Sequence, residues 1–331
     1  MRRSRPILGE DRASPPTRKS LPIRAVADGE PETFLGLPGF NDGDNAVLTC
    51  PDPVAYRSHM PRLKPLWEAL GQCSEQLRRQ PVTWVGCDFD GTLTPIRDHP
   101  DSVALDPRCQ KALGALSALE DVKVGVFSGR KLEDLTPRLG VPGLYLSGSS
   151  GLETMDEHGR REAHLSPGQE PPDSLRTDLA AWCQRFEGSW VEDKHGAIAV
   201  HYRAVQRRLQ PAFAAGLRRR MNPLKSQFRL VHGKKVFEVQ PAASGGKLEG
   251  LQRWLARGAE GATLFFFGDD TNDEPCFTAV REHGGYGVAV GRLASRAEYS
   301  LGTPDEVIWF LEWLLRECAE VRAQRVSLDR G

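Results

Sequence analysis

Hydrophobic and polar residues alternate in blocks over two parts of the chain, residues 61–153 and 242–331. Short, continuous apolar runs bounded by polar residues are typical of strands buried on both faces of a sheet. The runs predicted to be such strands are Val82–Cys87, Val122–Phe127 and Thr263–Phe267. Amphipathic stretches lie between them, so the pattern predicts an α/β fold with a mainly parallel sheet covered by helices on both faces.

Three helices of this part are predicted from their apolar faces and their first residues. One apolar face begins at Leu63 and continues to Leu77. A second helix is expected to begin at Asp106 and Pro107, because an aspartate followed by a proline is a good helix start. A third is expected to begin at Asp273, shortly after the last of the three strands.

The middle of the chain, residues 154–241, has a different pattern of hydrophobic and polar positions. Its pattern predicts two helices and several short antiparallel strands, which together would form a compact α+β domain. The strand elements predicted here are a hairpin at Leu152–Leu165, a strand at Val191–Tyr202 and a hairpin at Phe228–Val239 that turns at His232 and Gly233. We therefore predict that this segment is a cap inserted into a core domain formed by residues 61–153 and 242–331.

Residues 1–60 are predicted to be a disordered N-terminal extension. They contain eight of the 24 prolines of the chain and lack apolar periodicity. The Arg-rich start raises the question of a targeting peptide. Glu10, Asp11 and the absence of an apolar segment argue against one.

Charge and cysteine content narrow the class of protein. Basic and acidic residues are equal at 44 each, so the net charge does not favour a nucleic-acid or membrane partner. The apolar runs are too short to span a bilayer. The seven cysteines are scattered without the spacing of a zinc site, as in proteins that keep reduced thiols. We therefore expect a cytoplasmic protein.

The segment Asp88-Phe89-Asp90-Gly91-Thr92 follows a predicted buried strand and places two carboxylates at its carboxyl end. Ligands of parallel sheets bind at that edge. Asp88 could attack phosphorus, as the carboxylates of aspartyl-phosphate enzymes do. Asp90 could protonate the leaving oxygen and then activate water. The alternative is a turn in which both carboxylates cap backbone amides.

Asp269 and Asp270 follow the third predicted strand and complete a candidate metal site. Oxygen ligands from Asp88, Asp90, Asp269 and Asp270 suit a hard cation such as Mg²⁺. Asp270 and Asp273 could also orient water molecules bound to the metal. The alternative is a helix start rich in aspartate, which is favourable in itself. The acidic residues do not discriminate between Mg²⁺ and Mn²⁺.

Two further groups are candidates for contact with a phosphate. Ser128-Gly129-Arg130 follows the second predicted strand, where a hydroxyl and backbone N–H groups at a helix start can hold phosphate oxygens. Lys247 precedes the apolar face of a helix, and its ammonium could offset the charge of an attacking carboxylate. Each group alone also fits a plain alternative, a simple turn for the first and a solvated surface lysine for the second.

The order of these motifs resembles that of the haloacid dehalogenase superfamily of phosphohydrolases. Its members combine a DxDGT segment, a strand followed by Ser-Gly-Arg, a lysine and a strand followed by GDD. The resemblance implies a Rossmann-like α/β core in which Thr92, Ser128, Gly129 and Arg130 bind phosphate and Lys247 takes part in catalysis. The predicted α+β insert lies where the superfamily carries a cap of type IIB.

Within that superfamily, residues 81–315 resemble trehalose-6-phosphate phosphatases. The matching stretches are Asp88–Ile96, Ser128–Arg130, Ser147–Glu153, Glu192–Lys194, His201–Arg203, Lys235–Pro241 and Gly268–Glu274. The residues that the resemblance implies for sugar binding are Glu192, Lys194, His201, Arg203 and Glu238. The alternative is that they are ordinary surface charges on the strands of the cap.

Two of the positions that depart from the family pattern are Ser150, which stands where histidine is usual, and Gln240, which stands where a basic residue is usual. The implied function is Mg²⁺-dependent hydrolysis of trehalose 6-phosphate through a phosphoaspartate, with a trehalose-6-phosphate synthase as pathway partner. The alternatives are a phosphatase for another sugar phosphate, of the glucosylglycerol or glucosylglycerate type, a phosphomannomutase, and a non-catalytic sugar-phosphate sensor.

Overall fold

A nine-stranded sheet organises most of the chain. The computed structural model describes residues 63–97, 100–165, 168–194, 196–292 and 294–328. The strands of the large sheet are β1 (Lys64–Pro65), β2 (Thr83–Asp88), β3 (Val122–Phe127), β4 (Tyr145–Gly148), β5 (Glu153–Met155), β6 (Arg161–Ala163), β11 (Thr263–Gly268), β12 (Tyr286–Val290) and β13 (Tyr299–Leu301). The N-terminal extension predicted for residues 1–60 lies outside the described residues.

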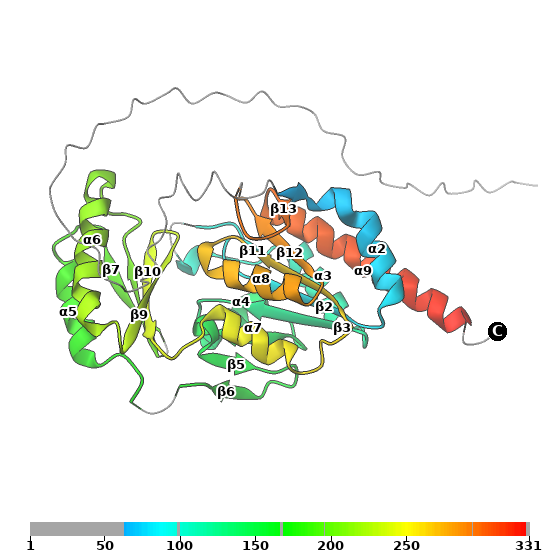
Figure 1. Cartoon of the computed structure of the whole chain (residues 1–331), viewed down its shortest axis with the longest axis horizontal. Coiled ribbons are helices and arrows are strands. Elements are labelled where there is room, and N and C mark those ends of the chain that lie inside the picture. Colours follow the sequence, from blue (N-terminus) through cyan, green and yellow to red (C-terminus); the bar gives the residue numbers. More distant parts are fainter. Residues whose placement is uncertain (1–62, 98–99, 166–167, 195, 293, 329–331) are drawn as a thin grey trace, which may run out of the picture. The chain divides into compact units, whose positions relative to one another are not determined.

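The strand order of this sheet is β1-β13-β12-β11-β2-β3-β4-β5-β6 (Figure 1). All pairs from β1 to β4 are parallel, whereas β5 and β6 add an antiparallel hairpin at one edge. The predicted α/β class with a mainly parallel sheet is therefore confirmed. The three strands predicted from the apolar runs, now β2, β3 and β11, are neighbours in the middle of the sheet.

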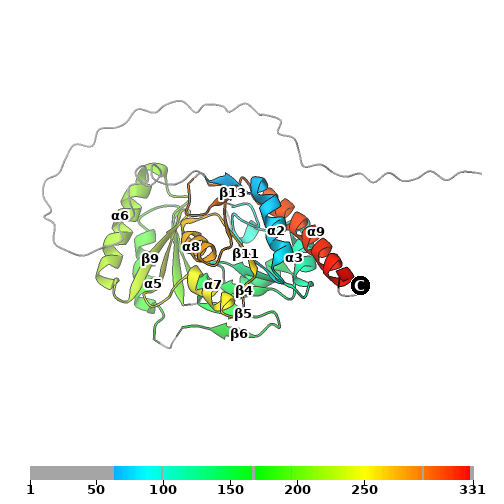
Figure 2. The ribbon, with the colours of Figure 1, turned by 45° about the vertical axis from the view of Figure 1, so that its right-hand side comes forward.

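Helices cover both faces of this sheet. On one face lie α2 (Leu70–Arg79), α3 (Pro107–Ser117), α4 (Leu132–Leu139) and α9 (Pro304–Leu328), and on the other lie α7 (Lys247–Leu255) and α8 (Glu274–Glu282). Figure 2 shows α2, α3 and α9 gathered beside one another. Strand β11 shows the two-sided burial directly, because Phe265 and Phe267 pack with the first group of helices and Phe266 packs with the second.

The predicted helix starts agree with the structure at two of three places. The Asp106 side chain accepts a hydrogen bond from the Arg108 backbone N–H at 2.7 Å and so caps α3. Asp273 directly precedes α8. The first predicted helix differs, because its first turn is replaced by β1 and a 3₁₀ turn. The 3₁₀ turns of the described chain are η1 (Leu66–Ala69), η2 (Pro100–Ser102), η3 (Ser149–Gly151), η4 (Arg207–Leu209), η5 (Asn222–Leu224) and η6 (Thr271–Asp273).

A second, four-stranded antiparallel sheet is formed by the middle of the chain. Its elements are β7 (Trp190–Lys194), β8 (Ala197–His201), β9 (Phe228–Gly233), β10 (Val236–Pro241), α5 (Asp173–Cys183) and α6 (Gln210–Met221). The strand order is β7-β8-β10-β9, and both helices pack on one face of this sheet. Phe237 and Val239 of β10 point into that apolar layer, so Glu238 and Gln240 lie on the opposite face.

Three predictions for the middle of the chain need correction. The predicted strand Val191–Tyr202 is two strands, β7 and β8, because the chain reverses at Gly196, whose φ of +70° favours glycine. The second hairpin turns at Lys234 and Lys235 rather than two residues earlier, since Gly233 pairs directly with Val236. The first hairpin exists as β5 and β6, but it extends the large sheet.

The division of the chain into core and cap stays a prediction. The predicted start of the cap at residue 154 falls within the β5–β6 hairpin of the large sheet, so the elements of the smaller sheet begin later in the chain than predicted. None of the described helices combines the length and apolar content needed to cross a bilayer.

Candidate active site

Three buried aspartates meet at the carboxyl ends of the central strands. Asp88 ends β2, Asp269 follows β11, and Asp273 ends η6. One carboxylate oxygen from each lies within 4.8 Å of the others. Because β2 and β11 are parallel neighbours, their carboxyl ends meet at one edge of the sheet, as the sequence predicted for the first two of these residues.

This cluster suits a hard divalent cation. The ligand atoms that it offers are all carboxylate oxygens, which a hard cation prefers. Burial raises the pKa of Asp88 well above its usual range and that of Asp269 to about 6. A bound cation would remove this unfavourable crowding of negative charge.

Lys247 is buried beside the attacking carboxylate predicted from the sequence. Its ammonium lies 2.7 Å from Asp88 Oδ1 and 2.6 Å from Asp273 Oδ1. Burial opposes the charge on Lys247, but the two carboxylates outweigh it and raise its pKa well above the usual value. The alternative of a solvated surface lysine is therefore wrong, since the side chain is only 2% exposed.

Of the four predicted metal ligands, the structure brings two together, Asp88 and Asp269, and adds Asp273. The Asp90 carboxylate instead accepts two hydrogen bonds from Arg130, both of 2.7 Å. The Asp270 carboxylate caps η6 through the Thr271 backbone N–H at 2.7 Å. Neither Asp90 nor Asp270 belongs to the acidic cluster found among the described residues.

The predicted phosphate-binding residues surround the same edge. Thr92 Oγ1 is buried and has no hydrogen-bond partner in the described part of the chain. The Ser128 hydroxyl accepts the Arg130 backbone N–H at 3.1 Å. Gly129 lies against the second sheet, because a Cβ there would come within 2.9 Å of Glu238 Oε1. Arg130 is held by Asp90 and by Asp134, also at 2.7 Å.

Gly91 is required where it stands, and its replacement provides a test of the cluster. Its φ is +93°, and a Cβ would lie 2.0 Å from Asp269 Oδ2. Gly159 has a similar φ of +81° with nothing within 4 Å of a Cβ. Alanine at either position should cost about 1–2 kcal/mol of stability through backbone strain. Only Gly91→Ala should displace Asp269 as well, weakening Mg²⁺ binding about 10- to 100-fold.

Isothermal titration with Mg²⁺ and thermal melts of both variants provide the measurement. Equal metal affinity in Gly91→Ala and Gly159→Ala would contradict a metal-binding role for Asp269.

A buried carboxylate organises the polar face of the second sheet. Glu238 accepts hydrogen bonds from Lys194 at 3.1 Å, from Ser150 at 2.9 Å and from Gln240 at 2.6 Å. Burial alone would raise the pKa of Glu238, but Lys194 and the other donors lower it below its usual value. Ser150 and Gln240, which both depart from the family pattern, are 90 residues apart in the chain and bind the same carboxylate.

The remaining predicted sugar-binding residues lie farther along this face. The Glu192 carboxylate accepts a hydrogen bond from His201 Nε2 at 2.8 Å, and Trp190 stacks on His201 with 4.0 Å between ring centroids. Arg203 is exposed and donates to the Lys234 carbonyl at 3.1 Å. No hydrogen bond or ion pair within the described residues joins Arg203 to the group around Glu238.

Two residues that the sequence did not single out also reach the site. Lys234, in the β9–β10 turn, forms an ion pair with Asp269, and its backbone N–H donates to Asp270 at 2.8 Å. Arg229, on β9, donates to Gln240 at 2.6 and 3.1 Å. The sequence carried no signal for either, because each lies in a strand or turn where a basic residue is also an ordinary surface residue.

A cavity of about 170 Å³ adjoins these groups. The polar side chains in its lining are Ser150, Arg229, Glu238, Gln240, Lys247, Thr271 and Asn272. Lys247 contacts the acidic cluster, whereas Glu238 belongs to the second sheet. The cavity thus connects the candidate catalytic group to the residues expected to bind a sugar.

Comparisons with known proteins point to one family. A family model described as trehalose-phosphatase matches residues 87–304. Trehalose-phosphate phosphatase of Mycobacterium tuberculosis is 31% identical over 294 residues, which cover 84% of this chain and 73% of the relative. The Mycobacterium leprae protein of the same name is 31% identical over 306 residues, covering 85% and 69%. The C-terminal domain of Candida albicans trehalose-6-phosphate phosphatase shares the fold, with a TM-score of 0.70 and 21% identity, covering 78% of this chain and 99% of that domain.

Proposed function

The chain belongs to the trehalose-phosphatase family, and from this premise we propose that it hydrolyses trehalose 6-phosphate to trehalose and phosphate through a phosphoaspartate on Asp88. The observation that carries the proposal is the difference between the contacts of the two Asp88 carboxylate oxygens. One oxygen is held by the Lys247 ammonium at 2.7 Å, and the other is buried without a hydrogen-bond partner among the described residues. A carboxylate held by one oxygen presents the other as a nucleophile.

The first half of the reaction transfers the phosphoryl group to the protein. Asp88 Oδ2 forms a bond to phosphorus while the bond from phosphorus to the sugar oxygen breaks. Asp90 gives its proton to that oxygen and releases trehalose. The Lys247 ammonium offsets the negative charge that gathers between carboxylate and phosphate.

The second half of the reaction hydrolyses the phosphoaspartate and regenerates the free Asp88 carboxylate. Asp90, now ionised, takes a proton from water as the water oxygen bonds to phosphorus. The bond from phosphorus to Asp88 breaks, which releases phosphate and frees the carboxylate. In the structure the Asp90 carboxylate is paired with Arg130, which fits the ionised form that acts as the base in this half. To give a proton in the first half, Asp90 would have to leave this ion pair and take up a proton.

We propose Asp88, Asp269 and Asp273 as the residues that would hold a divalent cation, with Mg²⁺ as the expected ion. Such an ion supplies positive charge that offsets the phosphate and the buried carboxylates. We also propose a cytoplasmic reaction, because the six cysteines of the described chain are buried free thiols. A trehalose-6-phosphate synthase would supply the substrate.

The function is tested by phosphate release from a panel of sugar phosphates. The panel contains trehalose 6-phosphate and the phosphates of glucosylglycerol, glucosylglycerate and mannose, each with Mg²⁺ and with EDTA. We expect kcat/KM for trehalose 6-phosphate to exceed the others by at least about tenfold. EDTA should abolish release, and added Mg²⁺ should restore it. A higher kcat/KM for another phosphate would replace the trehalose assignment, and interconversion of mannose phosphates would indicate a mutase.

A further inference from the structure

We propose that Arg229 sets which sugar the site accepts, both by offering a donor to a sugar hydroxyl in the cavity and by orienting Gln240 toward the buried carboxylate of Glu238. This inference rests on the proposed function, since it concerns the sugar half of the same substrate. Three observations support it: the orientation of the Gln240 amide, the charge of the Arg229 guanidinium and the absence of a side chain at Gly246.

The orientation of the Gln240 amide is fixed by its two neighbours. Arg229 and Gln240 are directly opposite each other on β9 and β10. The Arg229 Nη2 and Nε atoms both donate to Gln240 Oε1, at 2.6 and 3.1 Å. The amide nitrogen therefore faces Glu238 Oε2, to which it donates at 2.6 Å. In the flipped amide, the NH2 group would face the Arg229 guanidinium and the oxygen would face the Glu238 carboxylate, and both contacts would be repulsive. Arg229 therefore helps to determine which way Gln240 points.

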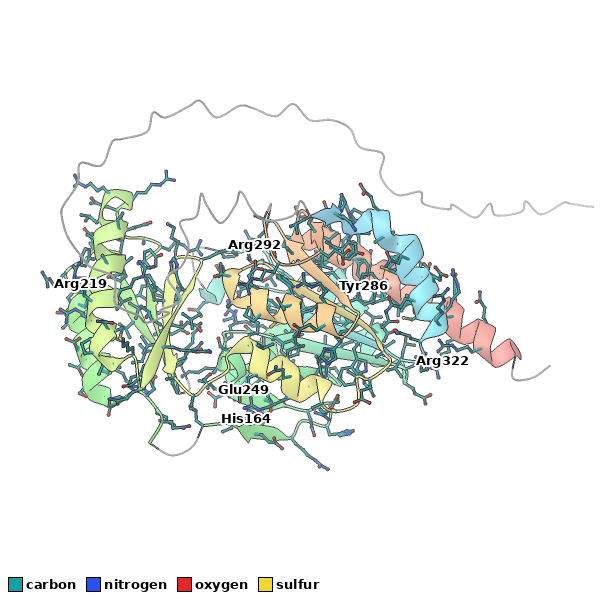
Figure 3. All side chains as sticks on the ribbon, viewed as in Figure 1. His164, Arg219, Glu249, Tyr286, Arg292 and Arg322 are labelled. Atoms are coloured by element: carbon teal, nitrogen blue, oxygen red, sulfur yellow. The ribbon has the colours of Figure 1, made fainter. Side chains whose placement is uncertain are left out.

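The charge of Arg229 is not neutralised by an ion pair within the described residues. Burial lowers its pKa, and Glu238 and Glu249 partly offset that effect. Both acids have other partners. Glu238 is paired with Lys194, and Glu249, labelled on α7 in Figure 3, is bound by Arg253 at 2.5 Å and by the Gly245 backbone N–H at 2.7 Å.

The Arg229 guanidinium packs against Gly246, the residue that precedes Lys247. Gly246 has a φ of +69°, and a Cβ there would lie 2.4 Å from Arg229 Nη2. The next residue, Lys247, binds Asp88 at 2.7 Å. Arg229 and Glu238 line the same cavity, so a ligand in it meets a donor group and an acceptor group together.

The ligand chemistry that fits this pairing is a polyhydroxylated sugar. A hydroxyl can accept from the guanidinium and donate to a carboxylate at the same time. Without Arg229, only Glu238 holds the Gln240 amide, so the Gln240 side chain can rotate away from the carboxylate. The carboxylate would then lose a donor and its fixed direction, and the sugar would bind less well while the phosphate chemistry at Asp88 remained in place.

Two variants test this chain of contacts. Arg229→Met removes the guanidinium, and the double variant Arg229→Gln with Gln240→Arg exchanges the two cross-strand partners. The control is Arg219→Met, because Arg219 is exposed on α6, away from the residues of the cavity (Figure 3). For each protein, kcat and KM are measured on trehalose 6-phosphate and on 4-nitrophenyl phosphate, and thermal melts are recorded.

We expect Arg229→Met to lower the ratio of kcat/KM on trehalose 6-phosphate to kcat/KM on 4-nitrophenyl phosphate by about 10- to 100-fold, mainly through KM. Arg219→Met should stay within about twofold of the wild type, and the exchange should recover about tenfold of the loss. Equal losses on both substrates, an unchanged ratio, or an exchange that recovers nothing would overturn the proposal. If the wild type prefers another sugar phosphate, the trehalose assignment fails, and the same ratio on that substrate tests Arg229.

Discussion

Replacing Asp88 by asparagine should reduce turnover of trehalose 6-phosphate by about 10⁴-fold or more, because an amide is a poor nucleophile toward phosphorus. The fold should survive the change. Burial and the neighbouring acids already raise the pKa of Asp88, so a neutral side chain relieves unfavourable charge at neutral pH. We therefore expect the melting temperature of the metal-free variant to be no lower than that of the wild type. Phosphate release and a thermal melt provide the two measurements.

Two companion variants make the result specific. Asp90→Asn should lower turnover by about 10²- to 10⁴-fold, since it removes the proton donor but leaves the nucleophile. Asp305→Asn is a matched control, because that side chain is 70% exposed and far along the chain from the strand-end motifs. Near-normal turnover in a folded Asp88→Asn protein would rule out the phosphoaspartate mechanism.

The position of the site could be predicted from the sequence because it follows from strand topology. Three apolar runs each ended in a polar motif, and parallel strands bring their carboxyl ends to one edge. The structure has β11, β2 and β3 side by side in that order, which brings Asp269, Asp88 and Ser128 to the same edge. No knowledge of side-chain direction was needed for that step.

The pairing of side chains within the site could not be predicted in the same way. Asp90, Asp270 and Asp273 all lie in turns, where the direction of a side chain depends on the neighbours it meets. Asp90 meets Arg130, which is 40 residues away, and Asp273 meets Lys247 from another helix. Spacing in the sequence carries no information about such contacts.

The second sheet shows a further limit to what the sequence predicts, namely the positions of turns. A run from Val191 to Tyr202 has the composition of one strand, but a left-handed glycine at position 196 folds it into two. The β9–β10 turn lies two residues later than predicted, at Lys234 and Lys235, where Lys235 has a φ of +66°, and it brings Lys234 to Asp269. Turn positions therefore decided which basic side chains reach the acidic cluster.

Specificity for the sugar should depend on Glu238 and Lys194, which form a buried ion pair of 3.1 Å next to the Ser128-Gly129-Arg130 turn. Glu238→Ala leaves Lys194 without its buried carboxylate, and Lys194→Ala leaves Glu238 with only the neutral donors Ser150 and Gln240. Either loss costs about 1–3 kcal/mol. We expect kcat/KM on trehalose 6-phosphate to fall about ten- to a few hundred-fold in each variant. Slow hydrolysis of 4-nitrophenyl phosphate, which has no sugar to bind, should fall far less.

Matched controls separate sugar binding from support of the fold. Glu187→Ala and Lys225→Ala remove exposed charges from the same part of the chain and should leave both activities near those of the wild type. Because a Cβ at Gly129 would come within 2.9 Å of Glu238 and 3.4 Å of Lys194, the pair also borders the phosphate-binding turn. If Glu238→Ala lowers both activities equally, the pair supports that turn rather than the sugar. A selective loss on trehalose 6-phosphate, with the melting temperature little changed, assigns the pair to the sugar.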